Sequence, residues 1–424
     1  MNVIISRSLH DREVEFLRAA GRQPSVSVQP ATGENLRKWG AGMMTLLVNW
    51  PRAALSLALF ICSATSIDAD TLKLDGQTMG SYYAIVIDGA SEAEGPAIQE
   101  KIEAILKDVN RQMSTWDSES EISKFNQSPV TEWFPVSPGF AEVVKESIRL
   151  HKLTDGAFDP TVAPLIDLWG FGAKKPKAFP TESEIDEARK RTGMQFIEVK
   201  LAPSSIRRTR EGITLTMSAI APGHASDRIA KLLNSLGFPS HSVDIGGEIR
   251  TGTAKAGGGK WRLGIESPFG EIQRVIECTD RSIATSGNYR NFFEYKGVRY
   301  SHTIDPATGK PVPNPPASVS ILCDTAMTAD GLATSLMVMG IEKGIPFAKK
   351  YGLSVLYLDV AGDDIVENAT GEFLTSDSPA SQLDSNNEEI GHRIPFVVTL
   401  AILLLAVTVM AVGVLAKNRE AKPF

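Results

Sequence analysis

A long uncharged segment near the end of the chain constrains the fold more than any other feature. Residues 394–416 read IPFVVTLAILLLAVTVMAVGVLA and contain no charged side chain. A helix of about 20 apolar residues is long enough to cross the hydrocarbon core of a bilayer. The sequence KNREAKPF follows, and an excess of basic residues marks the cytoplasmic side of a membrane. We therefore expect a transmembrane helix over residues 393–417 and a cytoplasmic tail at 418–424.

A second apolar run lies near the start of the chain. Arg52 is followed by AALSLALFICSA, which ends in small residues. This pattern is typical of a secretory signal with a cleavage site near Ala64 or Ala69. The segment is either cleaved, lipidated at Cys62 or kept as an uncleaved anchor. We assign residues 1–69 to an N-terminal extension with a signal peptide or anchor.

The two apolar ends enclose a single expected domain at residues 70–374. Residues 375–392, rich in Ser, Asp, Asn and Glu, are typical of a flexible linker. The polar residues before Arg52 are unusual for a signal, so Met43 or Met44 is an alternative start. The arrangement predicts a domain on the periplasmic side of a bacterial inner membrane, tethered by its C-terminal helix.

Composition excludes some classes of function. The chain has 44 basic and 50 acidic residues and a formal net charge of −6. A nucleic-acid-binding protein would carry a clustered basic excess, so we expect no nucleic-acid partner. The cysteines Cys62, Cys278 and Cys323 show no CxxC spacing, which argues against a cysteine metal site. A domain of this size also needs no disulfide for stability.

The central region alternates between helical and extended patterns. Apolar residues at three- and four-residue steps predict helices, and runs of β-branched or aromatic residues predict strands. We expect helices at residues 92–113, 140–153, 181–192, 225–236, 326–339 and 341–351, the third opening on a capping signature. We expect strands at residues 81–88, 213–217, 243–245, 261–265, 275–278, 319–322 and, last, 353–358. The mixture predicts an α+β domain.

The residue patterns alone give only a weak indication of a metal site. Asp330 and Thr334 are four residues apart on an expected helix, so their side chains share a face. Carboxylate and hydroxyl oxygens suit Mg²⁺ or Ca²⁺. From spacing alone, however, Asp330 is better explained as a helix cap and Thr334 as a surface residue. His302 alone is equally compatible with a structural role.

Aromatic residues gather in two loops. Trp116, Phe158, Trp169 and Phe171 could stack on a flat ring or could close the edge of a core. Asp159 precedes a proline, which is a common turn pattern.

Six segments together resemble the ApbE family, the FAD:protein FMN transferases. They are MSTWDSESEISKFN, GAFDPTVAPLIDLWGFG, SAIAPGHASD, VDIGGE, SGNYRNFFEYKGVRYSHTIDPATGKPV and TADGLAT, in the order of the family. The resemblance runs from Thr78 to about Leu358 and implies a single ApbE-like mixed α/β domain related to the T-fold. It implies Mg²⁺-dependent cleavage of FAD, release of AMP, and transfer of FMN to a threonine through a phosphoester bond. The acceptors of the family are typically subunits of membrane redox pumps.

The resemblance also implies site residues by position. The metal would be held by Asp330, Thr334, the carbonyl of Ala219 and the neighbouring Ala333. His302 and Asp330 would be catalytic, with His302 acting as an acid or base. The residues expected to contact FAD are Met79, Trp116, Ala157, Phe158, Asp159, Asp227, Thr303 and Ile304.

Some positions depart from the family pattern. Pro222 stands where a Lys or another polar residue is usual, and it lacks a backbone N–H. Trp116 replaces a usual Tyr, Thr216 a frequent Asp, and Ala163 a common Gly. Two alternatives therefore stay open beside transfer. One is an Mg²⁺-dependent FAD pyrophosphatase, and the other is a non-catalytic flavin-binding protein at the membrane.

Overall fold

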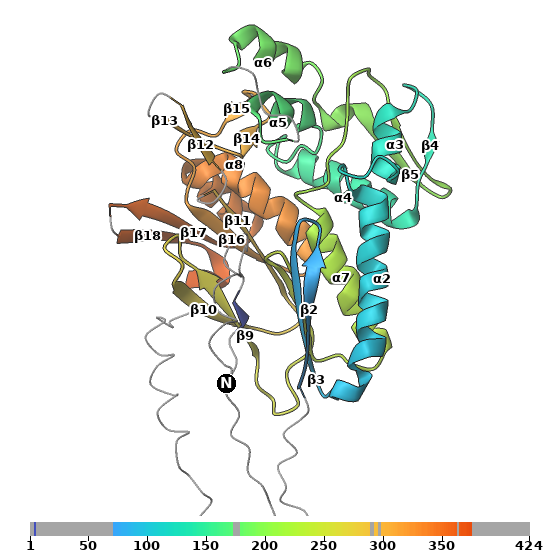
Figure 1. Cartoon of the computed structure of the whole chain (residues 1–424). Coiled ribbons are helices and arrows are strands. Elements are labelled where there is room, and N and C mark those ends of the chain that lie inside the picture. The colour runs from blue at the N-terminus through green and yellow to red at the C-terminus, as the bar shows by residue number, and fades with distance from the viewer. Residues whose placement is uncertain are drawn as a thin grey trace, which may run out of the picture.

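An eight-stranded antiparallel sheet forms the centre of the protein (Figure 1). The computed structural model describes residues 4–5, 71–172, 179–288, 292–295, 298–362 and 364–374. The strand order of the central sheet is β18-β17-β16-β11-β8-β7-β3-β2. Its strands are β2 (Thr71–Thr78), β3 (Ser81–Asp88), β7 (His241–Ile245), β8 (Glu248–Thr251), β11 (Ser282–Gly287), β16 (Ser318–Cys323), β17 (Ser354–Ala361) and β18 (Asp364–Ala369).

Helices and smaller sheets surround this centre. The helices are α2 (Gly95–Met113), α3 (Glu121–Gln127), α4 (Pro138–Leu153), α5 (Ala163–Trp169), α6 (Glu182–Arg189), α7 (Ala221–Ser235) and α8 (Ala326–Tyr351), with short 3₁₀ turns at Glu92–Glu94, Met194–Phe196 and Gly371–Leu374. The remaining strands are β1 (Ile4–Ile5), β4 (Phe134–Pro135), β5 (Ile197–Leu201), β6 (Ser204–Arg208), β9 (Trp261–Glu266), β10 (Ile272–Cys278), β12 (Phe292–Tyr295), β13 (Val298–Ser301), β14 (Ile304–Asp305) and β15 (Lys310–Pro311).

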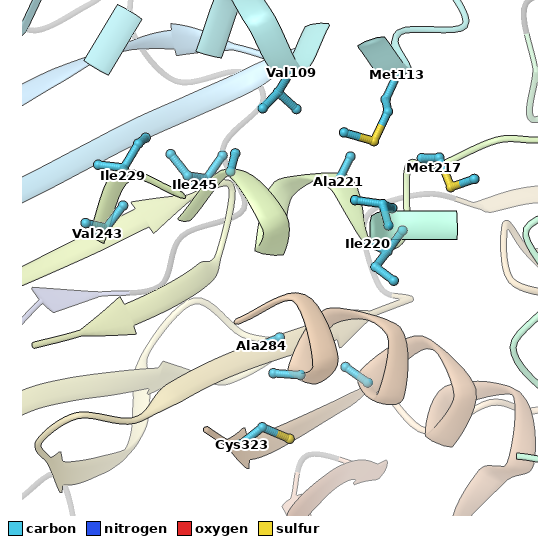
Figure 2. Close-up of a cluster of buried hydrophobic side chains, with 14 of the residues drawn as sticks. Val109, Met113, Met217, Ile220, Ala221, Ile229, Val243, Ile245, Ala284 and Cys323 are labelled. Atoms are coloured by element: carbon cyan, nitrogen blue, oxygen red, sulfur yellow. The ribbon is translucent and has the colours of Figure 1, made fainter. Parts of the chain in front are cut away.

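Both faces of the central sheet are covered, which explains why its strands carry apolar side chains on both faces. Side chains alternate between the two faces of a strand. In β16, Ile321 packs into the helix-side core, whereas Leu322 packs on the other face with the β9–β10 hairpin. In β17, Tyr357 and Leu358 divide in the same way. Figure 2 shows the helix-side core, where side chains of α2, α7, β7, β11 and β16 meet.

The two described cysteines lie on opposite faces of this arrangement. Cys323 of β16 belongs to the helix-side core, whereas Cys278 of β10 belongs to the core on the other face. Both are buried free thiols. Burial raises the pKa of Cys278 to about 11 and that of Cys323 to about 12, so both stay protonated at neutral pH.

Most predicted elements are present, with shifted ends. The strand predicted at residues 81–88 matches β3, and α6 begins with the expected capping box between Thr181 and Glu184. Helix α7 begins at Ala221, four residues before its predicted start, because Pro222 is tolerated in a first helical turn. The prediction that residues 353–358 form the last strand is wrong, since β18 follows and pairs with β17.

The strand predicted at residues 213–217 is wrong in a different way. The alternation was read correctly, since Ile213, Leu215 and Met217 are buried. Among the described residues, no strand pairs with the segment, however. The side-chain amide of Asn126 takes that place at Leu215, since its Nδ2 donates to Leu215 O at 2.9 Å and its Oδ1 accepts from Leu215 N at 2.8 Å. The Arg208 side chain donates to Ile213 O, and Thr216 N–H donates to Pro160 O, so scattered partners satisfy a backbone that periodicity assigns to a sheet.

The last long helix is interrupted as predicted. Separate helices were expected at residues 326–339 and 341–351, and the backbone of Gly340 is non-helical, with φ 67° and ψ 178°. Leu336 lies one turn before this break. The buried hydroxyl of Tyr357 donates to that carbonyl oxygen at 2.9 Å. The sheet therefore supports the kink.

Among the described residues, no helix combines the length and the apolar character that a membrane span requires. The predicted span at 393–417, the linker at 375–392 and the tail at 418–424 lie outside those residues. Of the predicted N-terminal extension, only β1 is described, and it pairs in parallel with β9.

Helices α7 and α8 meet closely at their N-terminal ends. A Cβ atom on Gly223 would lie 2.3 Å from the carbonyl oxygen of Ala326, so only glycine fits there. The carboxylate of Asp227 accepts from the backbone N–H groups of Ala326 and Met327 at 2.9 and 3.0 Å. Thr325 caps the N–H of Thr328 with its side chain at 3.3 Å. The first turn of α8 is therefore satisfied by one residue from α7 and one of its own.

Replacing Asp227 tests this junction. Asp227→Ala leaves two N–H groups of α8 without an acceptor and should lower the free energy of unfolding by about 2 kcal/mol. Asp227→Asn keeps one acceptor oxygen and should cost less. Urea denaturation of the full chain measures both. Asn234→Ala, an exposed position on the same helix, is the control and should change stability by less than about 0.5 kcal/mol. An Asp227→Ala protein as stable as that control would contradict the capping role.

Candidate functional site

A cavity of about 470 Å³ lies where the β7–β8 turn, β11 and α8 meet the loops that cover them. Its wall includes the predicted residues Ala157, Phe158, Asp159, Ala219, His302, Thr303, Ile304, Asp330 and Thr334. It also includes Pro160, Val162, Ile166, Thr216, Ser218, Gly246, Gly247, Glu248, Glu266, Thr285, Ser286, Gly287, Pro306 and Met337. Segments from five of the six quoted motifs therefore converge on one cavity.

Asp330 and Thr334 line the cavity from one face of α8. Asp330 does not cap the helix, because the N-cap is Thr325. Its carboxylate is buried, and Oδ2 accepts from the backbone N–H of Gly223 at 3.1 Å. The Thr334 hydroxyl is 3.4 Å from the Ser286 hydroxyl on β11. The alternative interpretation, in which Asp330 caps this helix and Thr334 is a surface residue, is therefore wrong.

The hydrogen bond to Asp330 also satisfies the start of α7. Gly223 is the third residue of α7, and the first N–H groups of a helix have no acceptor within the helix. Asp330 supplies that acceptor. Ala219 precedes α7, so its carbonyl lies outside the hydrogen-bond pattern of the helix, and Ala219 lines the same cavity as Asp330.

Carboxylates dominate the charge of the cavity. Asp159, Glu248, Glu266 and Asp330 line it, and no Lys or Arg among the described residues does. Burial raises the pKa of Asp330 to about 7, and the nearby Asp227 adds to the rise. Burial, and then the charges of Asp330 and Asp244, hold the pKa of Glu248 well above its usual range. The wall therefore favours the binding of a cation.

The turn before Glu248 is built on a further buried acid. Asp244 accepts from the N–H of Gly247 at 2.8 Å and from the Tyr82 hydroxyl at 3.1 Å, and burial raises its pKa to about 7. Gly246 and Gly247 have φ values of 66° and 113°, which only glycine adopts readily. The motif VDIGGE is thus a strained turn that ends at Glu248.

The loop after α4 carries Phe158 and Asp159 into the wall. His151 Nδ1 lies 2.9 Å from the carbonyl oxygen of Phe158 and 3.8 Å from Asp159 Oδ2. Asp159 Oδ1 accepts from the backbone N–H and the hydroxyl of Thr161 at 2.8 and 2.5 Å. Burial raises the pKa of Asp159, against these two hydrogen bonds and the His151 charge. The contacts of Asp159 give it a role in holding this loop.

His302 also lines the cavity. It follows β13 directly, and its ring lies 6.3 Å from that of Phe171 at an interplanar angle of 70°. Thr303 and the buried Ile304 come next along the wall. Trp169 is buried, stacks on Tyr300 with ring centroids 5.9 Å apart, and donates to Gly309 O at 2.8 Å. Trp169 therefore closes the edge of a core, which was the alternative to stacking on a flat ring.

Four predicted residues do not line this cavity. Trp116 is 80% exposed in the loop between α2 and α3. Met79 lies in the β2–β3 turn with φ 52°, two residues before Ser81, which faces Gly246 of the cavity wall. Asp227 caps α8, and Ala333 is buried in the helix-side core. The family pattern predicts a role in the site for all four residues, but in the structure none of them lines the cavity.

The departures from the family pattern have simple local explanations. Pro222 occupies the first turn of α7, where its missing N–H costs nothing. Thr216 keeps a polar group in the cavity wall, and its N–H donates to Pro160 O at 2.8 Å. Ala163 begins α5. None of them breaks the wall.

Sequence reasoning assigned no role to several residues of the wall. Glu248, Thr285 and Ser286 belong to quoted motifs or adjoin them, but nothing in their spacing singles them out. A signal was available for Glu248 alone, because two glycines before an acid at a strand start predict a tight turn. The Ser286 hydroxyl on β11 faces Thr334 of α8 only because the sheet and the helix pack together.

The donor set suits a hard cation. Asp330 and Thr334 supply a carboxylate and a hydroxyl, and Ala219 supplies a backbone carbonyl. Among the described residues, no three His, Cys, Asp or Glu side chains form a metal cluster. A metal here would therefore need hydroxyl, carbonyl and ligand oxygens as well, which is the habit of Mg²⁺. The residues present fit such an ion.

Comparisons with known proteins agree with this geometry. The ApbE family model matches residues 79–357. An FAD:protein FMN transferase of Vibrio cholerae serotype O1 is 42% identical over 330 residues, covering 77% of this chain and 98% of the relative. One of Haemophilus influenzae is 38% identical over 330 residues, covering 76% and 94%.

Two solved structures extend the comparison. The flavin transferase ApbE from Vibrio cholerae has a TM-score of 0.67 and 40% identity, covering 73% of this chain and 99% of that chain. The apo form of the Pseudomonas stutzeri flavinyl transferase ApbE has a TM-score of 0.67 and 33% identity, covering 73% and 97%. The chain belongs to the ApbE family and shares its mixed α/β fold.

Proposed function

We propose that the chain is an FAD:protein FMN transferase, which moves FMN from FAD to a threonine hydroxyl of an acceptor protein and releases AMP. One observation carries the proposal: Asp330, Thr334 and Ala219 line a single cavity in a chain of this family. Oxygen donors of this kind hold a cation against a pyrophosphate. The 38–42% identity to curated transferases supports the same reaction.

The reaction is a phosphoryl transfer that balances without a redox step. The threonine oxygen of the acceptor attacks the phosphorus of the FMN half of FAD, and the bond from that phosphorus to the AMP oxygen breaks. The hydroxyl proton must leave as the new phosphoester forms. His302 is the histidine of the cavity wall and is our candidate to take that proton.

Asp330, Thr334 and Ala219 would hold Mg²⁺ in this cavity. Bound there, the ion would polarise a phosphoryl oxygen and offset the charge that develops on the departing AMP. The protein contributes a fixed donor set, because α7 and α8 are joined at Gly223 and Asp227. Phe158, Val162 and Ile166 supply an apolar part of the wall that would exclude water from the pyrophosphate.

Sequence features support a proposed site of action, and the family resemblance suggests the class of acceptor. The uncharged segment at residues 394–416 and the signal-like run before residue 70 support a periplasmic domain tethered to the inner membrane. A membrane anchor would keep the enzyme beside acceptors in the same bilayer. A threonine in a subunit of a membrane redox pump is therefore our proposed acceptor.

Asp330→Asn tests the metal-dependent transfer. The substitution keeps the size of the side chain and removes its charge, so transfer should fall by at least about 100-fold. The full-length chain is incubated with FAD, Mg²⁺ and a threonine-containing pump-subunit fragment, and intact mass spectrometry weighs the acceptor. The wild-type chain should add the mass of FMN, and a chelator should abolish the gain.

The matched control is Glu146→Gln. Glu146 is also a carboxylate in contact with α8, through the Thr328 hydroxyl at 2.8 Å, but it lies outside the cavity. It should retain transfer within about threefold. Release of AMP without a mass gain would favour the pyrophosphatase alternative. FAD binding with neither product would leave a non-catalytic flavin-binding protein.

His302→Gln tests the proton acceptor separately from binding. A general base contributes about 10²–10⁴-fold to a rate, so kcat for transfer should fall by that range. The Kd for FAD, measured by quenching of flavin fluorescence, should change by less than about threefold. Unchanged kcat would exclude His302 as the base, and a loss confined to FAD affinity would make it a binding residue.

A further inference from the structure

We propose that Glu248 is the second carboxylate that holds Mg²⁺ in this cavity, together with Asp330. The inference rests on the proposed function, because it concerns the same cation. It adds a residue from the β7–β8 turn to a donor set that otherwise comes from α8 and the start of α7.

The fold directs the Glu248 side chain toward the helices. Glu248 lies directly opposite Ile245 in the antiparallel β7–β8 pair, and opposite residues point to the same face of a sheet. Ile245 packs in the helix-side core, so Glu248 faces α7 and α8 as well. The hydroxyl of Ser226 on α7 donates to the Glu248 carbonyl oxygen at 2.8 Å, which fixes the start of β8 against that helix.

Both carboxylates are thus positioned by the same helix. Asp330 accepts from Gly223 at the start of α7, and the backbone of Glu248 is tied to Ser226 one turn later. Both side chains line one cavity, and the charge of Asp330 acts on Glu248. A cation held by Asp330 would therefore lie within the electrostatic reach of Glu248 as well.

Glu248 is half-buried and differs from the buried acids of this region in its hydrogen bonds. Asp330 accepts from Gly223, Asp244 from Gly247 and Tyr82, and Asp159 from Thr161. Among the residues that the structure describes, no other residue donates a hydrogen bond to the Glu248 carboxylate.

Such an arrangement is unfavourable unless a cation completes it. A carboxylate withdrawn from water costs free energy when nothing compensates its charge. No Lys or Arg of the described residues lines the cavity, and the FAD pyrophosphate would add further negative charge. A divalent cation between the two carboxylates and the pyrophosphate offsets all three. Mg²⁺ accepts carboxylate oxygens directly or through its water molecules.

The test compares metal affinity with stability in the metal-free protein. Mg²⁺ is titrated by calorimetry into the full-length chain loaded with FAD, and Tm is measured in chelator and in Mg²⁺. Glu248→Gln should weaken Mg²⁺ binding by about 10–100-fold. In chelator its Tm should be equal to or higher than that of the wild type, because the repulsion from Asp330 and Asp244 is removed.

Further variants decide between explanations. Glu248→Asp keeps the charge and should retain Mg²⁺ affinity within about tenfold, and Glu146→Gln should bind as the wild type does. If Glu248→Gln binds Mg²⁺ like the wild type, or if it lowers Tm in chelator while affinity is unchanged, Glu248 has only a structural role and the inference fails. If Asp330→Asn also binds normally, the proposed metal site itself fails. If Asp330→Asn loses Mg²⁺ affinity and Glu248→Gln does not, the proposed metal site stands and only the inference about Glu248 fails.

Discussion

The close contact between the starts of α7 and α8 is the constraint on which the rest of the site depends. Gly223 lets the two backbones approach, since any side chain there would collide with Ala326. At that distance Asp227 can cap α8, and the N–H of Gly223 can reach Asp330. The same hydrogen bond satisfies an N–H group in the first turn of α7. Packing of the two helices therefore orients Asp330, and with it the face of α8 that carries Thr334 into the cavity.

Much of the fold could be predicted from the sequence because its strands and helices carry clear periodicity. The residues of β3 and the break at Gly340 were predicted correctly, since local residue preferences and packing agree there. The segment at residues 213–217 has the alternation of a strand, yet the backbone of Leu215 at its centre is satisfied by the amide of Asn126, which lies 89 positions away. Periodicity reports which side chains are buried, and it does not report what pairs with the backbone.

The site was less predictable from the residues alone than from the resemblance. Asp330 and Thr334 share a helix face, but that spacing fits a cap as well as a ligand, and only the position of Thr325 decides between them. Asp227 shows the opposite case. The resemblance places it against FAD, whereas in the structure its carboxylate caps the start of α8. Glu248 had no signal of its own beyond its turn. Its significance arises because, among the residues that the structure describes, no other residue donates a hydrogen bond to its carboxylate.

The charge of the cavity connects the binding of the proposed metal to that of the substrate. Four carboxylates line the cavity, and no Lys or Arg among the described residues does, so the wall would repel an anionic pyrophosphate. A cation reverses that field, so metal and FAD should each raise the affinity for the other, as linkage requires. An arginine-lined cavity would also bind FAD, but its affinity for FAD would not depend on the metal. An acidic wall makes the binding of the pyrophosphate conditional on the cation, because only the ion can offset the repulsion between the carboxylates and the substrate.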